Sequence, residues 1–308
     1  MLSRKKILLA KVESTYGTDA TPAAADAILT KNLDITPYDG NTVQRDLVRP
    51  TLGNEEAINV APNVKVSFEV EIAGSGAAGT APAWGSVLRA CGFSETVNAG
   101  TDVQYQPVSS SFESASLHYE QDGQIHKVLG CRGSVSFDLS SGGIPVMKFS
   151  FTGLYAKPVT GSLTADLSAF QVPLPVTKAN TPTYTIHGYS AIANSFSVDM
   201  SNNVVHRNQI GHEEISITDR SPSGQMVIDA PTLTDKDMFA LVESHNGITT
   251  DAVQVVHGTV AGNIVQIDAP KVQLSGISGT DLDGQYAYQL NTSFIPDAGD
   301  DEIVITVK

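Results

Sequence analysis

The stretch Val64-Lys-Val-Ser-Phe-Glu-Val-Glu-Ile72 alternates strictly between apolar and polar side chains. A period of two places the apolar set on one face of an extended chain, which is typical of a half-buried antiparallel strand. The same pattern recurs at residues 135–139, and again at Phe149 and Phe151. Gly142-Gly143 separates those two runs and indicates a hairpin turn. The sequence therefore predicts an all-β protein of antiparallel strands.

Two short segments depart from this pattern and predict helices. Four apolar positions recur at helical spacing in each segment: Trp84, Val87, Leu88 and Cys91 in the first, and Met238, Leu241, Val242 and His245 in the second. Pro82 suits the first turn of one helix, and Gly92 ends it. Thr234 with Asp237 resembles a capping box for the other helix, and Asn246-Gly247 closes it.

The two helices belong to an internal repeat. Asn41-Thr-Val-Gln-Arg45 is similar to Asn203-Val-Val-His-Arg207. Each motif is followed by a glycine and paired acids, which are Gly53, Glu55 and Glu56 in one copy and Gly211, Glu213 and Glu214 in the other. A strand, the helix and two further strands then follow in both copies. The order strand–strand–helix–strand–strand occurs twice and predicts a duplication. Convergent patterning of two β-sandwiches is the alternative.

This repeat sets the expected domain boundaries. Residues 1–32 precede the first copy, have no counterpart in the second, and are expected to form an arm that packs on a neighbour or on the chain's own surface. Residues 33–156 form a first domain, and residues 183–308 form a second. The connector, residues 157–182, is rich in Pro, Thr and Ser. The predicted fold class is all-β with minor α: two tandem β-sandwich or barrel domains, each with one flanking helix.

Composition narrows the class of protein. The chain has 308 residues and a net charge of −14, with no basic patch for gripping phosphates. An acidic surface repels DNA, which suits a passive conduit, although solubility alone would also explain it. The charged fraction of 17% is low, as on a protein that covers itself with its own copies; secreted β-sandwiches share this feature.

The cysteines and the apolar runs indicate the cellular compartment in which the protein is expected to fold. Two cysteines suit folding in a reducing cytosol rather than a disulfide scaffold. The apolar run at residues 7–10 is too short for a signal peptide, and no stretch is long enough to span a membrane. We therefore expect a soluble protein made in the cytoplasm, with no membrane partner.

No motif for catalysis or metal binding is found in the sequence. The seven histidines include no helical pair beside a glutamate. His206 and His212 lie near Glu213 and Glu214, but their counterparts in the first copy are neutral amides, so loop histidines are expected. The glycine-rich residues 74–79 lack the Lys-Ser or Lys-Thr of a phosphate loop and are read as a flexible connection. The acidic residues 297–302 are read as a solvated turn before a last strand at 303–307. We expect no enzyme, no cofactor and no metal.

Four phrases resemble a known family over residues 6–155. They are Leu9-Ala-Lys-Val-Glu-Ser-Thr-Tyr-Gly-Thr-Asp19, Arg45-Asp-Leu-Val-Arg-Pro-Thr-Leu-Gly53, Ala81-Pro-Ala-Trp-Gly-Ser-Val-Leu-Arg-Ala-Cys-Gly-Phe93 and Phe149-Ser-Phe-Thr-Gly-Leu-Tyr155. The chain resembles the two-domain major tail-tube proteins of long-tailed, siphovirus-type bacteriophages. The resemblance implies tail-tube β-sandwich domains whose strands join neighbours into rings. Those rings stack into a tube around a tape-measure protein that passing DNA later replaces, without specific DNA binding. Such a protein is part of the virion tail and is assembled in the host cytoplasm.

The resemblance also implies where the subunits meet. The excursion at residues 39–61 would reach the adjacent ring, with residues 202–216 as its duplicate. Seven charged residues are candidates for inter-subunit contacts: Arg45, Arg49, Glu55, Glu56, Arg207, Glu213 and Glu214. Solvated loop charges of little energetic weight are the alternative. With a duplicated chain, a homotrimer makes a pseudo-hexameric ring, and a hexamer of whole chains competes with it.

Two other functions remain open at this point. A receptor-binding or carbohydrate-binding β-sandwich, from a virion baseplate or a surface appendage, would predict an exposed aromatic cluster or a metal site. The single tryptophan is read as a core residue. A hydrolytic enzyme on a β scaffold would need the catalytic motifs that the sequence lacks.

Overall fold

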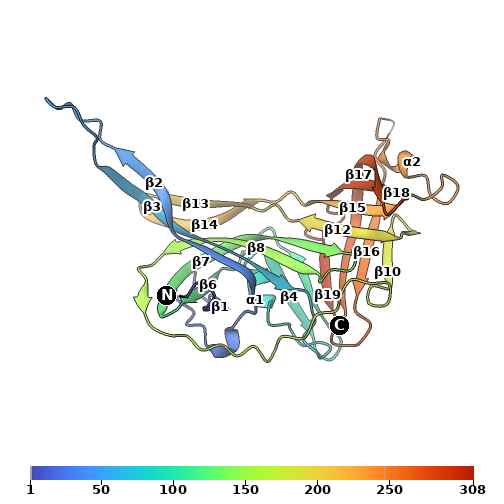
Figure 1. Cartoon of the computed structure of the whole chain (residues 1–308), viewed down its shortest axis with the longest axis horizontal. Helices are drawn as coiled ribbons and strands as arrows, with labels where there is room; N and C mark the ends of the chain where they lie inside the picture. Colours follow the sequence, from blue (N-terminus) through green and yellow to red (C-terminus); the bar gives the residue numbers. More distant parts are fainter. Residues whose placement is uncertain (1, 246) are drawn as a thin grey trace.

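The decisive alternating stretch lies in strand β3 (Ala57–Glu71). Its five apolar side chains, Val64 through Ile72, are at most 2% exposed, while Lys65, Ser67 and Glu69 point the other way. This computed structural model describes residues 2–245 and 247–308, and it is an elongated, almost entirely β protein (Figure 1). The predicted all-β class with minor α is confirmed.

The strands fall into two runs along the chain. The first run is β1 (Lys6–Val12), β2 (Lys31–Gln44), β3, β4 (Phe93–Asn98), β5 (Asp102–Pro107), β6 (Ala115–Gln121), β7 (Gln124–Ser140), β8 (Val146–Tyr155) and β9 (Val159–Thr160). The second run is β10 (Thr183–Ile186), β11 (Tyr189–Ser190), β12 (Ala193–Asp199), β13 (Asn203–Gln209), β14 (His212–Asp219), β15 (Ser223–Asp229), β16 (Thr250–His257), β17 (Val265–Leu282), β18 (Gln285–Phe294) and β19 (Val304–Val307). A single 3-10 turn, η1 (Ala24–Asp26), follows β1.

The order of strand pairing is the same in both runs. The first run pairs antiparallel in the order β1–β6–β7–β8–β3–β2. The second pairs antiparallel in the order β10–β16–β17–β18–β15–β12. In the first, β2 and β3 run on past the body as one long hairpin. In the second, the matching extension is a separate hairpin, β13–β14.

Part of residues 1–32 packs on the chain's own surface, which is one of the two placements expected, but the segment also has a counterpart, which the sequence did not predict. β1 pairs with β6 along seven residues, and β10 takes the equivalent place beside β16. Leu8, Leu9 and Ala10 are buried. The short apolar run that is too brief for a signal peptide is instead a strand covered on both faces, which needs no alternation.

The two runs are joined in one sheet at two places. β7 pairs with β12, so that residues 136–140 of one lie beside residues 195–199 of the other. β19 lies between β17 and β5 and pairs with both. These two joints tie the first and second runs together side by side.

The glycine-rich loop 74–79 also holds the two runs together and is not merely a flexible connection. The backbone N–H of Gly76 donates to Gly262 O at 2.9 Å, and that of Gly74 donates to Asn263 Oδ1 at 2.8 Å. A Cβ at Gly74 would lie 2.1 Å from Gly262 O. The loop is glycine-rich because two backbones pass each other here with no space for side chains.

Both predicted helices exist but are shorter than expected. α1 (Gly85–Arg89) begins after Trp84, whose indole Nε1 donates to Ala73 O at 2.9 Å. α2 (Met238–Val242) is capped by Asp237, which accepts from the backbone N–H groups of Phe239 and Ala240. The predicted capping box from Thr234 is therefore wrong, because the aspartate itself is the N-cap. His245 lies beyond α2, and Asn246 lies outside the described residues.

Candidate assembly surfaces

The extension of β2 and β3, residues 39–60, is a hairpin that projects from the body; we call it the arm (Figure 1). Residues 45–56 form its tip. Apolar side chains stand exposed along it: Val43, Leu47, Val48, Leu52, Ile58 and Val60, with Tyr38 at its base. Val48 and Leu52 have relative exposures of 102% and 105%, so they touch almost nothing in the chain. Gathered exposed apolar side chains on a projecting hairpin mark an interaction surface.

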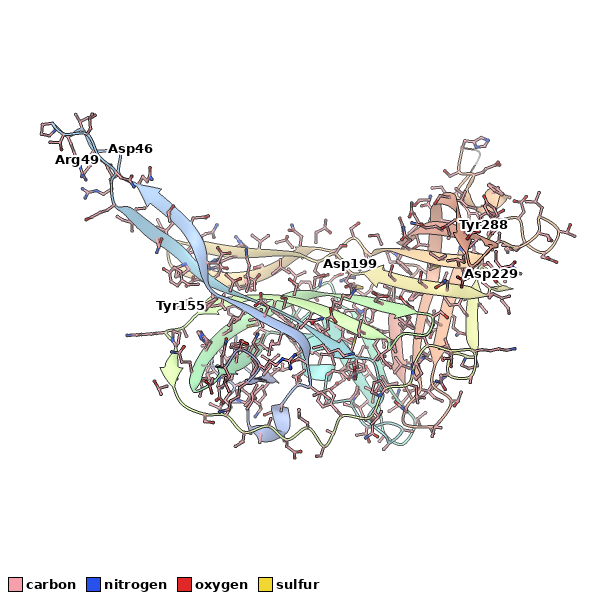
Figure 2. The ribbon with its side chains drawn as sticks, in the orientation of Figure 1. Asp46, Arg49, Tyr155, Asp199, Asp229 and Tyr288 are labelled. Carbon is pink, nitrogen blue, oxygen red and sulfur yellow. The ribbon has the colours of Figure 1, made fainter. Side chains whose placement is uncertain are left out.

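The tip holds four of the predicted contact residues. Arg49 Nε lies 3.3 Å from Glu55 Oε1, and Glu55 Oε2 accepts from the backbone N–H of Leu47. Arg45 and Glu56 are exposed and form no ion pair within residues 2–245 and 247–308. Figure 2 shows Asp46 and Arg49 at the far end of the arm, away from the rest of the molecule.

The hairpin β13–β14, by contrast, lies on the body. Arg132 of β7 reaches it: Nη1 donates to Glu214 Oε1 at 2.6 Å and to Ile215 O at 2.7 Å. The Tyr16 hydroxyl accepts from the backbone N–H of Ile215 at 2.6 Å, and the Arg132 guanidinium lies 4.9 Å over the Tyr16 ring. The hydrogen bond from Arg132 lowers the pKa of Glu214, and burial raises the pKa of Tyr16 to about 12. This hairpin is bound to its own chain rather than free to reach out like the arm.

The remaining predicted residues lie on that hairpin. Arg207 stands directly across from Glu214 in the strand register, yet the Glu214 carboxylate binds Arg132. Arg207 is exposed, and within residues 2–245 and 247–308 its one side-chain hydrogen bond is to Gln209 Oε1, at 3.4 Å. Glu213 accepts from Asn208 Nδ2 at 2.8 Å and lies 3.0 Å from His206 Nε2. Neither acid pairs with Arg207.

A broad polar face runs across both halves of the sheet. The strands follow one another in the order β2–β3–β8–β7–β12–β15–β18–β17. We define the polar face by side chains that these registers place on the same side of the sheet: Asp34, Ser67, Ser150 and Ser134 form one row across β2, β3, β8 and β7, and Ser197, Gln225 and Asn291 form another across β12, β15 and β18, with Ser278 of β17 on the same side. Its opposite face is the apolar core. Period-two alternation therefore sorts the whole sheet into one packed and one polar side.

The charge of the polar face is negative. Its lysines at positions 31, 65 and 148 each bind a carboxylate, from Glu71, Asp39 and Asp138 respectively. The Lys65 and Lys148 ammonium groups lie 2.6 and 2.9 Å from their partners. Asp199 and Asp229, labelled in Figure 2, add further negative charge along β12 and β15. Because the cations are paired, carboxylates set the sign of the face.

The acidic residues 297–302 are the predicted solvated turn only in part: Asp297 to Gly299 are exposed, but the acids that follow are held to the body. Glu302 is 5% exposed, and its Oε1 accepts from Arg220 Nε at 3.0 Å. Arg220 also pairs with Asp300. Burial alone would raise the pKa of Asp300, but hydrogen bonds from Ser109 and Arg220 outweigh it and lower that pKa. The cluster fastens the C-terminal loop to the loop after β5.

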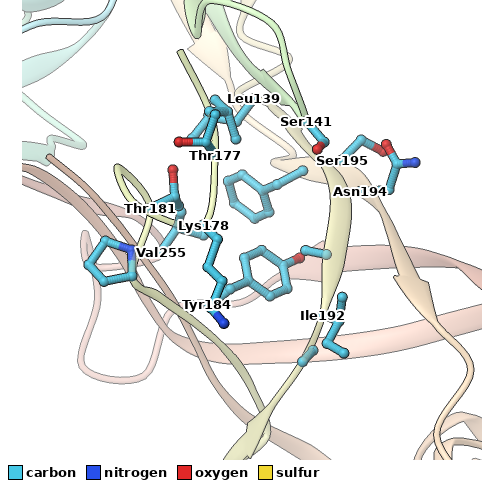
Figure 3. Close-up of a pocket in the computed structure, with 15 residues that line it drawn as sticks. Leu139, Ser141, Thr177, Lys178, Thr181, Tyr184, Ile192, Asn194, Ser195 and Val255 are labelled. Atoms are coloured by element: carbon cyan, nitrogen blue, oxygen red, sulfur yellow. The ribbon is translucent and has the colours of Figure 1, made fainter. Parts of the chain in front are cut away.

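A pocket and an aromatic cluster are relevant to the alternative function, a receptor-binding or carbohydrate-binding β-sandwich. A pocket of about 430 Å³ lies between the β7–β8 turn, the connector and β10–β12 (Figure 3). Tyr184 lines it, and the buried hydroxyl of this tyrosine has no hydrogen-bond partner in the described part of the chain. On another surface, Phe239, Tyr286 and Tyr288 form an aromatic cluster. The ring centroids of Phe239 and Tyr286 each lie 5.6 Å from that of Tyr288. Sequence reasoning missed this cluster because α2 and β18 are far apart along the chain.

The described residues hold no metal site and no membrane-spanning helix, and their two thiols are buried. Among residues 2–245 and 247–308, no three His, Cys, Asp or Glu side chains gather as a metal site would require. Cys91 and Cys131 are free thiols, and burial raises the pKa of both well above its usual value. No helix in the same part of the chain has the length and apolar character needed to cross a membrane.

The fold and these surfaces define a structural β subunit with a projecting arm and one continuous polar sheet face. A family model described as phage tail tube protein matches residues 3–303. The chain therefore belongs to the phage tail tube family, whose members form the tube of the virion tail. No curated protein matches the chain.

Proposed function

We propose that this chain closes laterally into rings, that the rings stack through the arm, and that the polar face lines a channel for DNA ejection. One observation carries the proposal: the eight-stranded sheet ends in an edge strand at both sides. Within the described residues, β2 pairs with β3 alone, and β17 beyond Leu274 pairs with β18 alone. Open edges join readily to other strands. When each copy joins its two neighbours edge to edge around a closed ring, both of these edge strands are paired in every copy.

The arm supports stacking. It projects from the body (Figure 1), and its apolar side chains are exposed. A surface of this kind is stabilised when a second copy covers it. Arg45 and Glu56, with no ion pair in the described residues, and Arg49 and Glu55, paired within the tip, would supply polar contacts to the adjacent ring. Arg207, Glu213 and Glu214 would contribute to such contacts from the hairpin β13–β14, which lies on the body.

The polar face suits a channel that does not bind what passes through it. Its carboxylates repel phosphates, and its lysines are held by acids. Small serine, threonine and amide side chains form hydrogen bonds with water. A tape-measure protein would fill the channel before DNA takes its place. Such a subunit performs no enzymatic reaction, and it would assemble in the host cytoplasm.

The repeated pairing order favours two tube domains in each chain: a second at residues 183–308, and a first that comprises residues 33–156 together with strand β1, which takes the place of β10. Six such domains from three chains would then make a pseudo-hexameric ring. A hexamer of whole chains is the competing arrangement and would give a ring of twice that mass.

Negative-stain electron microscopy and mass photometry of the purified protein test this function. Rings or stacked discs, with a species at three times the chain mass, are the expected result. A strict monomer at all concentrations, with no tubes, would count against self-assembly.

The aromatic cluster favours a second function, carbohydrate binding. Tyr286 and Phe239 are exposed, and aromatic faces of this kind can stack on sugar rings. Binding of the purified protein to a panel of bacterial surface glycans, lost in Tyr286→Ala, would support it. Tubes that assemble normally from Tyr286→Ala, with no glycan bound by the parent chain, would remove it.

A further inference from the structure

The pocket between the β7–β8 turn, the connector and strands β10 to β12 lies where the two runs of the chain meet (Figure 3). Its volume of about 430 Å³ is within the range of pockets that hold small molecules. Leu139 comes from the first run, and Phe196 and Val255 come from the second. All three are at most 4% exposed and give the pocket an apolar lining.

The pocket differs in charge from the rest of this acidic chain. The net charge is −14, yet no aspartate or glutamate of the described residues lines the pocket. Lys178 of the connector lines it, is exposed, and forms no ion pair or side-chain hydrogen bond within residues 2–245 and 247–308. Ser141 and Asn194 add a hydroxyl and an amide. The pocket therefore offers an anion a cation and neutral donors, with no carboxylate to repel it.

A buried hydroxyl on the wall of the pocket lacks a partner. Tyr184 of β10 lines the pocket, and its hydroxyl is buried with no hydrogen-bond partner in the described residues. Figure 3 shows this hydroxyl pointing across the pocket, toward the segment that carries Ile192 and Asn194. Burial raises the pKa of Tyr184, so the hydroxyl keeps its proton and is a donor. A buried donor without an acceptor is costly, and a ligand oxygen would satisfy it.

The wall opposite that hydroxyl is not held by a regular ladder. The pairing of β12 with β15 shifts by one residue between Ala193 and Ser195, which leaves Asn194 in a bulge. Ile192, just before it, is apolar and yet 69% exposed. A ligand that enters beside the bulge would cover Ile192 and meet the Tyr184 hydroxyl. Lys178 carries its charge on a flexible stem, which can turn to the same point.

We infer that this pocket binds an apolar carboxylate, whose hydrocarbon body fills the apolar part of the pocket and whose carboxylate is held by Tyr184 and Lys178. Hydrocarbon surface removed from water supplies the affinity. The carboxylate accepts from the hydroxyl and from the ammonium group, and hydrogen bonds to an ionised group are the stronger kind. Because both runs line the pocket, a bound ligand also stabilises the folded chain.

Isothermal titration calorimetry of the purified chain with octanoate tests this site. Octanoate should bind at a single site in each chain and raise the melting temperature. Each methylene removed, as in heptanoate and hexanoate, should weaken binding by about fourfold. Octylammonium, which has the same tail and the opposite charge, should not bind. Octylammonium that binds as tightly as octanoate would overturn the assignment, since the pocket would then select only for apolar surface.

Two variants place the binding in this pocket. Lys178→Gln should weaken octanoate binding by about tenfold, and Lys178→Arg, which keeps the charge, should bind nearly as well as the parent chain. Tyr184→Phe should also weaken binding by about tenfold or more, because a hydrogen bond to a charged group is lost. Its folded state should be at least as stable as that of the parent, because the unpartnered hydroxyl is gone.

Lys157→Gln is the matched control, since Lys157 is an exposed lysine of the same connector and does not line the pocket. It should bind octanoate like the parent chain. Octanoate that binds Lys178→Gln and Tyr184→Phe as tightly as the parent chain would overturn the inference. A parent chain that does not bind octanoate at all would overturn it as well.

Discussion

At the scale of single residues, Glu13 is a buried acid that holds the N-terminal segment to the sheet. It is 8% exposed. Its carboxylate accepts from the backbone N–H groups of Gly17 and Gly130 and from the hydroxyls of Ser114 and Ser116, at 2.7–2.8 Å. Four donors compensate for the burial of one charge.

Glu13→Ala should therefore destabilise the fold strongly. The change leaves four buried donors without an acceptor, and we expect a loss of about 3–5 kcal/mol in the free energy of unfolding. Urea denaturation followed by circular dichroism measures it. Glu56→Ala, on the exposed arm, is the control and should change stability by less than about 0.5 kcal/mol. Equal stabilities for the two variants would contradict the role of the buried carboxylate.

A second residue-scale prediction concerns pH. His187 Nε2 lies 2.9 Å from Val272 O and donates to it, while Nδ1 is buried with no partner in the described residues. Burial lowers the pKa of His187, because a proton on Nδ1 would have no acceptor. The unfolded chain binds this proton at about pH 6.5 and the folded chain does not. Stability is thus full above about pH 6.5 and declines as the pH falls toward the lowered pKa.

Melting temperatures between pH 7.5 and pH 5 check this. His187→Gln should flatten the decline between pH 6.5 and 5.5, even if it lowers stability overall. His245→Gln, at an exposed histidine with no ion pair in the described residues, is the matched control. A slope identical in all three proteins would show that His187 does not contribute.

At the scale of elements, similar sequence did not mean similar placement. Residues 39–61 and 202–216 share a motif, and the sequence predicted two matching excursions. One is the free arm, and the other is held to the body by Arg132 and Tyr16. Those two residues lie in other parts of the chain, so no local pattern could reveal the docking. Both helices, and strands such as those at residues 64–72, 135–139 and 303–307, follow by contrast from local periodicity and were predicted.

The arm yields a prediction that separates stacking from ring closure. Val48→Asp/Leu52→Asp should not alter folding, because both side chains are fully exposed. It should abolish stacking by placing charges in a surface that needs to be covered by apolar contact. Electron microscopy should then show single rings without tubes. Val172→Asp, at an exposed position in the connector, is the matched control. Normal tubes from the arm variant would remove the arm from the stacking contact.

At the scale of the whole molecule, sequence reasoning found the repeat but not its full extent. The order strand–strand–helix–strand–strand was predicted because those strands carry their own alternation, whereas β4, β5, β6 and β16 were missed. The place of β1 beside β6 was missed, since a fully buried strand has no alternation to detect. The joints between the two runs also depend on residues far apart in the chain, such as Tyr105 and Ile305. Ion pairs of this reach, including that of Arg220 with Glu302, are equally invisible to local patterns.

The last strand gives the strongest test of how the two runs depend on each other. β19 pairs with β17 of the second run and with β5 of the first, and Ile303, Ile305 and Val307 are buried there. Burying each such side chain contributes roughly 1.5–3 kcal/mol. Three of them approach the roughly 5–15 kcal/mol that stabilises a typical domain. A chain ending at Glu302 should therefore lose its single cooperative transition, and amide exchange should rise in both β5 and β17. Ile305→Val should keep one transition and cost about 1 kcal/mol. If exchange rose in β17 alone, β19 would not be the element that makes the two runs one folding unit.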